Sequence, residues 1–287
     1  MKIAFLGTGL MGEPMAQKLI DAQLSLIVYN RTQSKLTALK AAGARIANTP
    51  SEAIKNSEII ILMLSNAAAI ADVLLARDTL PLLKSRTVIQ MGTIAPKQSK
   101  EISEQIVRNG GEYLEAPVLG SIPQVKSGEL LVMVGSSPEQ FTKYSPILKH
   151  FGPEPIHVGT VGKAAAMKLA LNQLIAALTA AFSLSLSFVQ KEGVEVDRFM
   201  EILRQSALYA PTFDKKISRM RDRNFENPNF PTKHLLKDTN LFLEEAGEIG
   251  LDTTGLEGIQ KLIKKAIDNG FSDSDYSAIF AAINPQK

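Results

Sequence analysis

Along the first 160 positions, short continuous runs of apolar residues alternate with stretches in which apolar residues recur at helical spacing. The apolar runs are KIAFLG, LSLIVYN, EIIILML, TVIQM, YLEAPV and LLVMVG. Runs of this length and composition are typical of strands that are buried on both faces. The helical patterns between them include residues 13–22, 34–42, 97–109 and 139–150. Strands that alternate with helices predict a parallel sheet covered by helices on both faces.

From about residue 160 the pattern changes, and no convincing strand follows. Helical periodicity covers residues 162–191, 196–207, 212–223, 233–249 and 256–270. Turn-forming residues separate these segments. We therefore predict an α/β protein with two domains, a doubly wound parallel sheet over residues 1–160 and an all-helical domain over residues 161–287. A long helix opens the second domain, and we expect a ligand cleft between the two.

Composition excludes several kinds of chemistry. The 287 residues contain no cysteine, so a disulfide, a thiolate metal site and a cysteine nucleophile are excluded, and a cytoplasmic location is expected. The net charge of +3 is too small to indicate nucleic acid or a membrane surface as a partner. The three histidines are too scattered to predict a metal site. The apolar segment 164–190 is long enough to cross a membrane, but its hydroxyl and amide residues favour a buried helix of a soluble protein.

A glycine pattern lies between the first predicted strand and the first predicted helix. Gly7, Gly9 and Gly12 form G-x-G-x-x-G. The first glycine permits a tight turn, the second lets a pyrophosphate approach the backbone, and the third lets helix and strand pack closely. The free N–H groups at the helix start suit phosphate, so we predict a dinucleotide site, with a purely structural glycine turn as the alternative. Further expected cofactor contacts are Leu10, Met11, Met63, Leu64 and Ser65.

The second predicted strand ends where a site for NAD normally carries an acidic residue. Asn30 stands at that position, and Arg31, Thr32 and Lys35 follow it. A carboxylate would repel a 2′-phosphate, whereas an arginine can bind one through two hydrogen bonds. We therefore predict NADP(H) as the cofactor, with a contribution from each of these four residues. The alternative is a solvated basic turn at the start of a helix.

Within residues 164–190 only one residue, Lys168, is charged. Asn172 follows four positions later and therefore lies on the same helix face. Burial lowers the pKa of a lysine, which can then exchange protons with a carbonyl oxygen that receives hydride. We predict Lys168 as the proton donor and Asn172 as a group that binds the substrate or orients the amine. The alternative is a lysine whose amine reaches water at the flank of the helix.

Two strand ends in the first half combine glycine with polar residues. Thr93 follows the strand TVIQM, where ligands bind in open α/β sheets, so we predict that it contacts nicotinamide or substrate. Gly120 and Ser121 follow the strand YLEAPV, and their N–H groups are predicted to hold a substrate carboxylate. The alternatives are an ST-turn before a helix and an ordinary strand-to-loop turn.

A charged group lies in the second half of the chain. Lys233, Lys237 and Asn240 fall near one face of a predicted helix, and Asp238 follows Lys237. A solvated charged face is the ordinary explanation of such a pattern.

Together these motifs resemble the β-hydroxyacid dehydrogenase family over essentially the whole chain. The segments that carry the resemblance are FLGTGLMGEPMA, NRT, MGTIAP, EAPVLGS, GKAAAMKLALN and KHLLKD. The resemblance implies a Rossmann domain, a long interdomain helix, an all-helical domain and a homodimer or homotetramer. It also implies that Lys168 is the catalytic lysine, Asn172 a substrate-side amide and Thr93 a nicotinamide or substrate contact. Lys237 and Asp238 match the family's Lys-Asp motif near the active site.

Within that family, NRT with Lys35, and EAPV in place of DAPV, resemble the NADPH-dependent glyoxylate and succinic semialdehyde reductases. These relatives reduce short aldehyde-acids to hydroxyacids. The family's APVSG loop reads APVLG here, so Leu119 replaces a serine that helps to hold the substrate carboxylate, and a less polar or longer substrate also fits. Three alternatives remain open. They are oxidation of a 3-hydroxyisobutyrate-type hydroxyacid, which usually goes with an acidic residue where Asn30 stands; imine reduction, which commonly lacks the lysine; and NADPH binding without turnover.

Overall fold

The structure of the protein, a computed structural model, describes residues 1–286. The chain divides into two compact units, Met1–Lys168 and Leu169–Lys287. The division falls inside helix α8 (Lys163–Lys191), a few residues beyond the domain boundary that the sequence predicts near residue 160.

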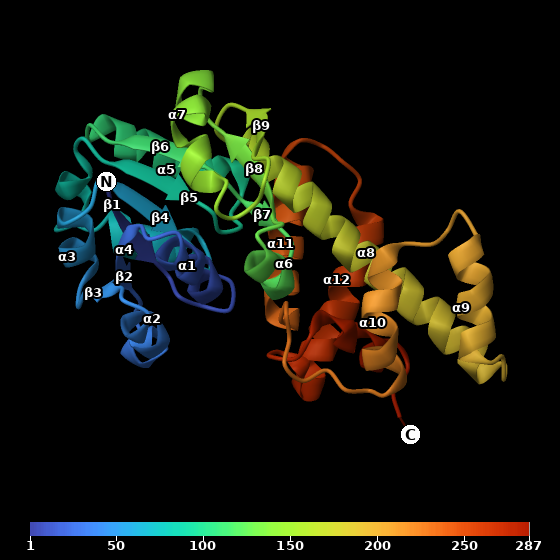
Figure 1. The fold of residues 1–287 in the computed structure, drawn as a ribbon. Coiled ribbons are helices and arrows are strands. Elements are labelled where there is room, and N and C mark those ends of the chain that lie inside the picture. The colour runs from blue at the N-terminus through green and yellow to red at the C-terminus, as the bar shows by residue number, and fades with distance from the viewer. Residues whose placement is uncertain (287) are drawn as a thin grey trace. The chain divides into compact units, whose positions relative to one another are not determined.

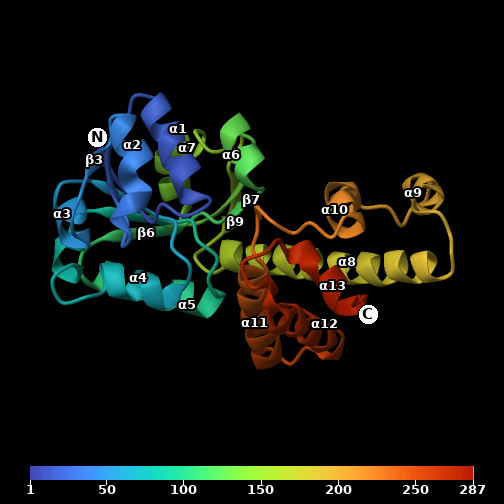
Figure 2. The same ribbon diagram turned by 90° about the horizontal axis from the view of Figure 1, so that it is seen from below.

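The first unit contains a sheet with helices on both faces (Figures 1 and 2). Its strands are β1 (Lys2–Leu6), β2 (Ser25–Tyr29), β3 (Arg45–Ile46), β4 (Ile59–Leu62), β5 (Thr87–Gln90), β6 (Glu112–Glu115), β7 (Val118–Leu119), β8 (Leu131–Gly135) and β9 (Ile156–Gly159). Its helices are α1 (Gly12–Asp21), η1 (Gln33–Leu36), α2 (Thr37–Ala41), α3 (Pro50–Lys55), α4 (Ala67–Leu74), η2 (Leu80–Leu83), α5 (Pro96–Arg108), α6 (Ile122–Ser127) and α7 (Pro138–Leu148).

The strand order is β3-β2-β1-β4-β5-β6-β8-β7, with β9 beside β8. The strands from β3 to β6 are parallel, with β1 between β2 and β4 and the chain crossing over from β3 to β4, which is the Rossmann arrangement. The predicted doubly wound parallel sheet is confirmed, and at one end the structure adds β8, which runs antiparallel to both β6 and β7. Apolar content alone does not distinguish the direction of a buried strand.

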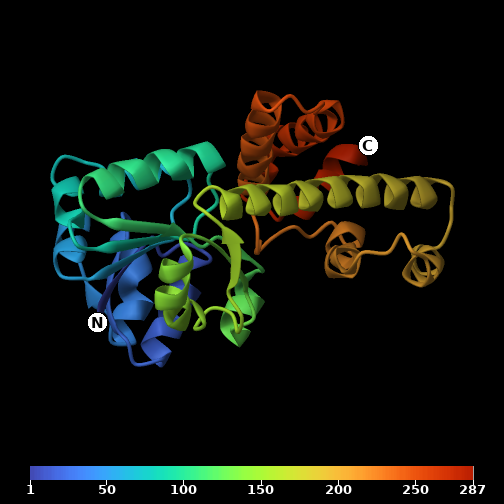
Figure 3. The same ribbon diagram turned by 90° about the horizontal axis from the view of Figure 1, so that it is seen from above.

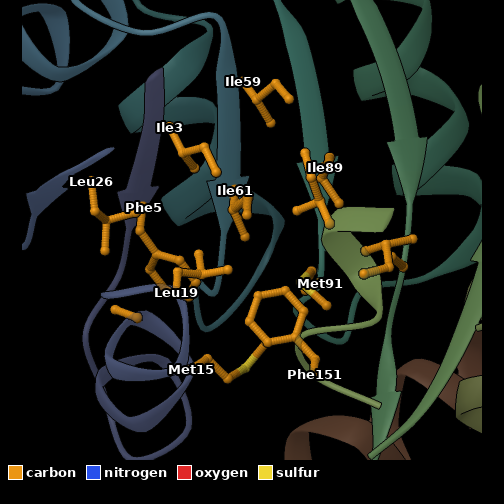
Figure 4. Close-up of a cluster of buried hydrophobic side chains, with 14 of the residues drawn as sticks. Ile3, Phe5, Met15, Leu19, Leu26, Ile59, Ile61, Ile89, Met91 and Phe151 are labelled. Carbon is orange, nitrogen blue, oxygen red and sulfur yellow. The ribbon is translucent and has the colours of Figure 1, made fainter. Parts of the chain in front are cut away.

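Alternation along each strand assigns its side chains to two cores. On β1, Ile3 and Phe5 pack with α1, α2 and α7 on one face, whereas Ala4 and Leu6 pack with α3, α4 and α5 on the other. Figure 4 shows side chains of the first cluster, with Phe5 of β1 beside Leu19 of α1 and Met15 of α1 beside Phe151. Because both faces are covered, the central strands are mostly apolar, as the sequence pattern predicts; β4 is apolar throughout, and the polar exceptions on β1 and β5 are Lys2, Thr87 and Gln90.

The second unit is helical and is built around the residues of α8 from 169 onward. Its other helices are α9 (Val196–Gln205), α10 (Pro211–Arg221), α11 (Thr232–Glu248), α12 (Thr254–Ala266), η3 (Ile267–Phe271), η4 (Tyr276–Ala278) and α13 (Ile279–Ile283). In Figure 3, α9 and α10 lie along one side of α8, and α11 and α12 lie along the other. Two apolar clusters follow this arrangement, one around Phe182 and Phe213 and one around Ala176 and Leu235.

By length and composition alone, α8 would be able to cross a membrane, and it is the one helix of residues 1–286 with that property. Its hydroxyl residues Thr179, Ser183 and Ser187 are nevertheless buried against protein. Ser187 Oγ donates to the carbonyl oxygen of Ser183 at 2.7 Å, so this hydroxyl is satisfied within the helix.

A buried ion pair connects distant segments of the second unit. Lys216 of α10 donates to both carboxylate oxygens of Asp275 at 2.8 Å, and neither side chain is more than 9% exposed. Asp275 Oδ1 also accepts from the N–H and the hydroxyl of Ser277. Burial lowers the pKa of Lys216, while the adjacent carboxylate acts in the opposite direction.

Candidate active site

The glycine loop after β1 combines two crowded positions with one open position. Gly7 has a φ of +100°, and a Cβ there would lie 2.4 Å from the carbonyl oxygen of Met63. A Cβ on Gly12 would lie 1.9 Å from the carbonyl oxygen of Gly7. A Cβ on Gly9 would meet nothing within 4 Å, and Gly9 is exposed. The loop therefore fits a pyrophosphate, which needs a closed turn, an open backbone and the helix start that follows.

Residues after two neighbouring strands surround this loop. Leu64, which follows β4, lies between Gly7 and Gly92, since a Cβ on either glycine would come within 2.8 Å of a Leu64 atom. Ser65 and Leu10 are exposed, whereas Met11 packs on the apolar core beside α1. The carboxyl ends of β1, β4 and β5 thus converge at one edge, as the ligand-binding edge of an open α/β sheet requires.

Asn30 connects the turn after β2 to the glycine loop through a hydrogen bond. Its Oδ1 accepts from the N–H of Thr8 at 3.2 Å, and its Nδ2 donates to the carbonyl oxygen of Thr32 at 3.0 Å. Arg31, Thr32 and Lys35 are exposed. An amide at this position carries no charge that would repel a phosphate, and two basic side chains stand beside it.

Thr93 is held near the same edge by a residue that the sequence reasoning missed. Gln90 is 1% exposed at the end of β5; its Nε2 donates to the carbonyl oxygen of Gly92 at 2.9 Å, and its Oε1 accepts from the N–H of Gly92. Gln90 therefore fixes the turn that presents Thr93, which is half-buried. The sequence itself indicates Gln90, because a glutamine is unusual in a predicted buried strand such as TVIQM.

The segment after β7 is less open than its sequence predicts. Gly120 has a φ of +135°, a backbone conformation that suits glycine. The N–H of Ser121 donates to Gln124 Oε1 at 3.0 Å, and its hydroxyl donates to the same oxygen at 2.8 Å. A substrate carboxylate at Ser121 would have to displace the Gln124 side chain. Leu119 is half-buried and pairs with Leu131 across the β7–β8 ladder.

Lys168 lies in the second turn of α8 and is 9% exposed. The start of this helix is capped by the carboxylate of Glu115, whose Oε1 accepts three backbone N–H groups. Sequence reasoning did not assign this carboxylate a role; its signal was an acidic residue at the end of an apolar strand. The side chain of Lys168 is therefore buried and does not extend into water.

In the second unit, three of the predicted site residues come together. Asn172 Nδ2 donates to Asp238 Oδ2 at 2.6 Å, and Lys237 Nζ lies 2.8 Å from Asp238 Oδ1. Asn172 and Asp238 are 2% and 3% exposed. Asn172 Oδ1 is buried and has no hydrogen-bond partner among the described residues, so an acceptor remains for a ligand.

The remaining polar residues of α11 do not join this group. Lys233 pairs with Asp273, and Asn240 accepts from Gln260 at 2.6 Å. The charged face that the sequence suggests therefore separates into one buried group around Asp238 and an exposed remainder.

Two family models match the chain and together cover most of it. Residues 2–162 match the family model of the NAD binding domain of 6-phosphogluconate dehydrogenase. Residues 162–283 match the model described as NAD-binding of NADP-dependent 3-hydroxyisobutyrate dehydrogenase.

Curated relatives and solved structures cover nearly the whole chain. Glyoxylate/succinic semialdehyde reductase 2 (chloroplastic) of Arabidopsis thaliana is 32% identical over 100% of this chain and 80% of its own length. Reductase 1 of the same species is 31% identical over 99% of this chain and 98% of its own. The solved structure of Mycobacterium tuberculosis 3-hydroxyisobutyrate dehydrogenase with L-serine shares the fold, with a TM-score of 0.88, 21% identity and 98% coverage of both chains.

The fold, the glycine loop and these matches define an oxidoreductase that uses a nicotinamide cofactor. The chain belongs to the β-hydroxyacid dehydrogenase family.

Proposed function

We propose that this protein is an NADPH-dependent reductase of short aldehyde-acids, which converts succinic semialdehyde to 4-hydroxybutyrate and glyoxylate to glycolate. The observation that carries the proposal is the burial of Lys168 in α8, one helical turn before Asn172. The two Arabidopsis relatives are named glyoxylate/succinic semialdehyde reductases, which supports this substrate class.

The cofactor side of the proposal rests on the first unit. The exposed backbone at Gly9 and the start of α1 would hold the pyrophosphate, with Leu10 and Met11 beside it and Met63 to Ser65 along the next strand end. Arg31 and Lys35, with the hydroxyl of Thr32, would bind the 2′-phosphate of NADP(H). When bound, the nicotinamide supplies a hydride to the carbonyl carbon.

Lys168 supplies the proton for the same reaction. Reduction of an aldehyde consumes one hydride and one proton, and the proton goes to the carbonyl oxygen as the hydride reaches carbon. Asn172, on the same helix face, has a buried carbonyl oxygen that can accept a hydrogen bond from the nascent hydroxyl or from the amine. Asp238 holds that amide in place through its hydrogen bond.

The substrate carboxylate requires donors near Thr93 and the Gly120–Ser121 turn. Ser121 can supply them once Gln124 rotates away, because its N–H and hydroxyl point at the same oxygen. Leu119 adds an apolar side chain where the family has serine. A four-carbon aldehyde-acid presents more methylene surface to Leu119 than glyoxylate does, so we expect the longer substrate to be preferred.

We further propose that the protein acts as a homodimer or homotetramer in the cytoplasm. Leu174, Leu184 and Phe188 are between 50% and 63% exposed, and their spacing places them on one side of α8. A second copy of the chain covering this stripe would remove it from water.

Deuterium transfer tests the reaction directly. NADPH labelled with deuterium on the transferred side of the nicotinamide is incubated with succinic semialdehyde and the protein, and the product is examined by NMR. The proposal expects one deuterium at the alcohol carbon of 4-hydroxybutyrate, and none with heat-denatured protein. Unlabelled product, or no product while NADPH remains bound, would contradict it.

A further inference from the structure

A buried carboxylate lies where β6 ends and α8 begins. Glu115 has no exposed surface, and its Oε1 accepts from the N–H groups of Gly162, Ala164 and Ala165 at 2.8, 2.9 and 3.1 Å. These groups belong to the helix start, where N–H groups lack partners within the helix. Glu115 therefore caps α8 from a strand that lies about 50 positions earlier in the chain.

The other side of the carboxylate is fixed as well. Ser99 of α5 donates to Glu115 Oε2, and the hydroxyl of Tyr113 lies 2.8 Å from Ser99 Oγ. A Cβ on Gly135 would lie 2.4 Å from Glu115 Oε1, so β8 leaves room for the carboxylate by carrying glycine there. Burial raises the pKa of Glu115, and its four hydrogen-bond donors act in the opposite direction. The side chain thus has one position available to it.

The capped turn lies directly before the lysine. Lys168 follows Ala165 by three residues, which is about 4.5 Å along a helix axis at 1.5 Å per residue. The three N–H groups converge on one oxygen, so they set both the rotation of the helix and its position along its own axis. Any movement of that first turn is passed to Lys168 through the continuous helix.

We propose that Glu115 is a positioning residue, which locks the first turn of α8 and thereby fixes the Lys168 amine for proton transfer. The proposal rests on the proposed reductase function. Glu115 contacts neither reacting atoms nor cofactor in this account and acts only through the helix. Misplacement of a reacting group by about 1 Å lowers a rate by about 100-fold, so loss of the cap is expected to be visible in kcat.

Three variants separate positioning from general stability. Glu115→Ala removes every hydrogen bond of the cap. Glu115→Gln keeps a carbonyl oxygen for the three N–H groups, and Ser99 can turn its hydroxyl to accept from the new amide. Glu112→Gln is the matched control, because Glu112 lies on the same strand and is partly exposed, where it pairs with Lys143 and Tyr144. Each variant is assayed for kcat, for the KM of NADPH and for amide hydrogen exchange of residues 162–168.

For Glu115→Ala we expect kcat to fall about 10- to 100-fold. In free energy this loss equals the contribution of one or two hydrogen bonds to a charged group. The KM of NADPH should change less than about twofold, because the glycine loop and Arg31 lie at other strand ends. Exchange over residues 162–168 should accelerate at least about tenfold as the capped turn opens. Glu115→Gln should restore kcat to within about threefold of the parent, and Glu112→Gln should leave every readout unchanged. If the alanine variant does not fold, Glu115→Asp, with its shorter reach, should show the same pattern in part.

Two results would overturn the proposal. One is faster exchange in the alanine variant with an unchanged kcat, which would make Glu115 a structural cap only. The other is an equal loss of kcat and of NADPH binding, which would indicate general damage to the first unit. Failure of the proposed function is distinguishable, because the parent protein would then turn over neither aldehyde, whereas hydrogen exchange would still report whether Glu115 holds the turn.

Discussion

Replacing Gly9 by alanine should strengthen the fold and weaken cofactor binding at the same time. A Cβ on Gly9 would meet no protein atom within 4 Å, and the backbone of Gly9 has a φ that residues with side chains readily adopt. Such a Gly→Ala change restricts the unfolded chain and raises the free energy of unfolding by about 0.4–1 kcal/mol. The same methyl group would project into the space that we assign to the pyrophosphate, so it should weaken cofactor binding.

The expected loss of affinity follows from the hydrogen bonds displaced. A methyl group that moves the pyrophosphate off the backbone N–H groups removes one or two hydrogen bonds to a charged group, each worth about 1.5–3 kcal/mol. The Kd of NADPH should therefore rise at least about tenfold. Fluorescence titration with NADPH gives the Kd, and urea unfolding monitored by circular dichroism gives the free energy of unfolding.

Gly12→Ala is the matched comparison within the same loop. Its Cβ would lie 1.9 Å from the carbonyl oxygen of Gly7, so the turn has to shift by more than 1 Å before any ligand binds. That variant should lose stability and affinity together. An unchanged NADPH affinity in a well-folded Gly9→Ala protein would refute the assignment of this space to the pyrophosphate.

Three further changes test other parts of the account. Arg31→Ala should raise the KM of NADPH at least about tenfold and leave that of NADH almost unchanged in steady-state assays; equal losses would remove Arg31 from the 2′-phosphate site. Lys168→Ala should lower kcat by about 10²- to 10⁴-fold while the Kd of NADPH is kept, and retained turnover would eliminate its role as proton donor. Asp275→Asn leaves the buried Lys216 without its charged partner and should cost about 3–5 kcal/mol of unfolding free energy in urea, whereas Arg198→Ala at an exposed pair should cost less than about 1 kcal/mol. A small loss for Asp275→Asn would show that the pair contributes little.

Local pattern was sufficient for the elements that form the centre of the sheet. The runs around Phe5, Ile60 and Ile89 predicted β1, β4 and β5, because a strand covered on both faces is mostly apolar. The pattern did not reveal β3, which has two residues, or β9, whose residues are largely exposed or half-buried. It also gave no direction for β8, since that depends on the connection and not on composition.

The candidate site was predictable in its residue types and not in its contacts. Gly7, Gly12 and Lys168 were identified from spacing and from an isolated charge, and the structure confirms the crowding at the glycines and the burial of the lysine. The hydrogen bond from Asn172 to Asp238 joins positions 66 residues apart, and the cap by Glu115 joins positions up to 50 apart. Such pairs exist only once the chain has folded. Spacing along the sequence cannot supply them.

The central claim is that this chain reduces aldehyde-acids with NADPH. Initial rates of nicotinamide oxidation by the purified protein, with succinic semialdehyde and with glyoxylate, and with NADPH and NADH in turn, test it most directly. The account predicts turnover of both aldehydes, a higher kcat/KM for succinic semialdehyde, and a preference for NADPH of at least about tenfold. Equal use of the two cofactors would contradict the assignment of the Asn30–Arg31 turn to the 2′-phosphate of NADPH. Absence of turnover while NADPH is bound would contradict the proposal that the protein is an aldehyde-acid reductase.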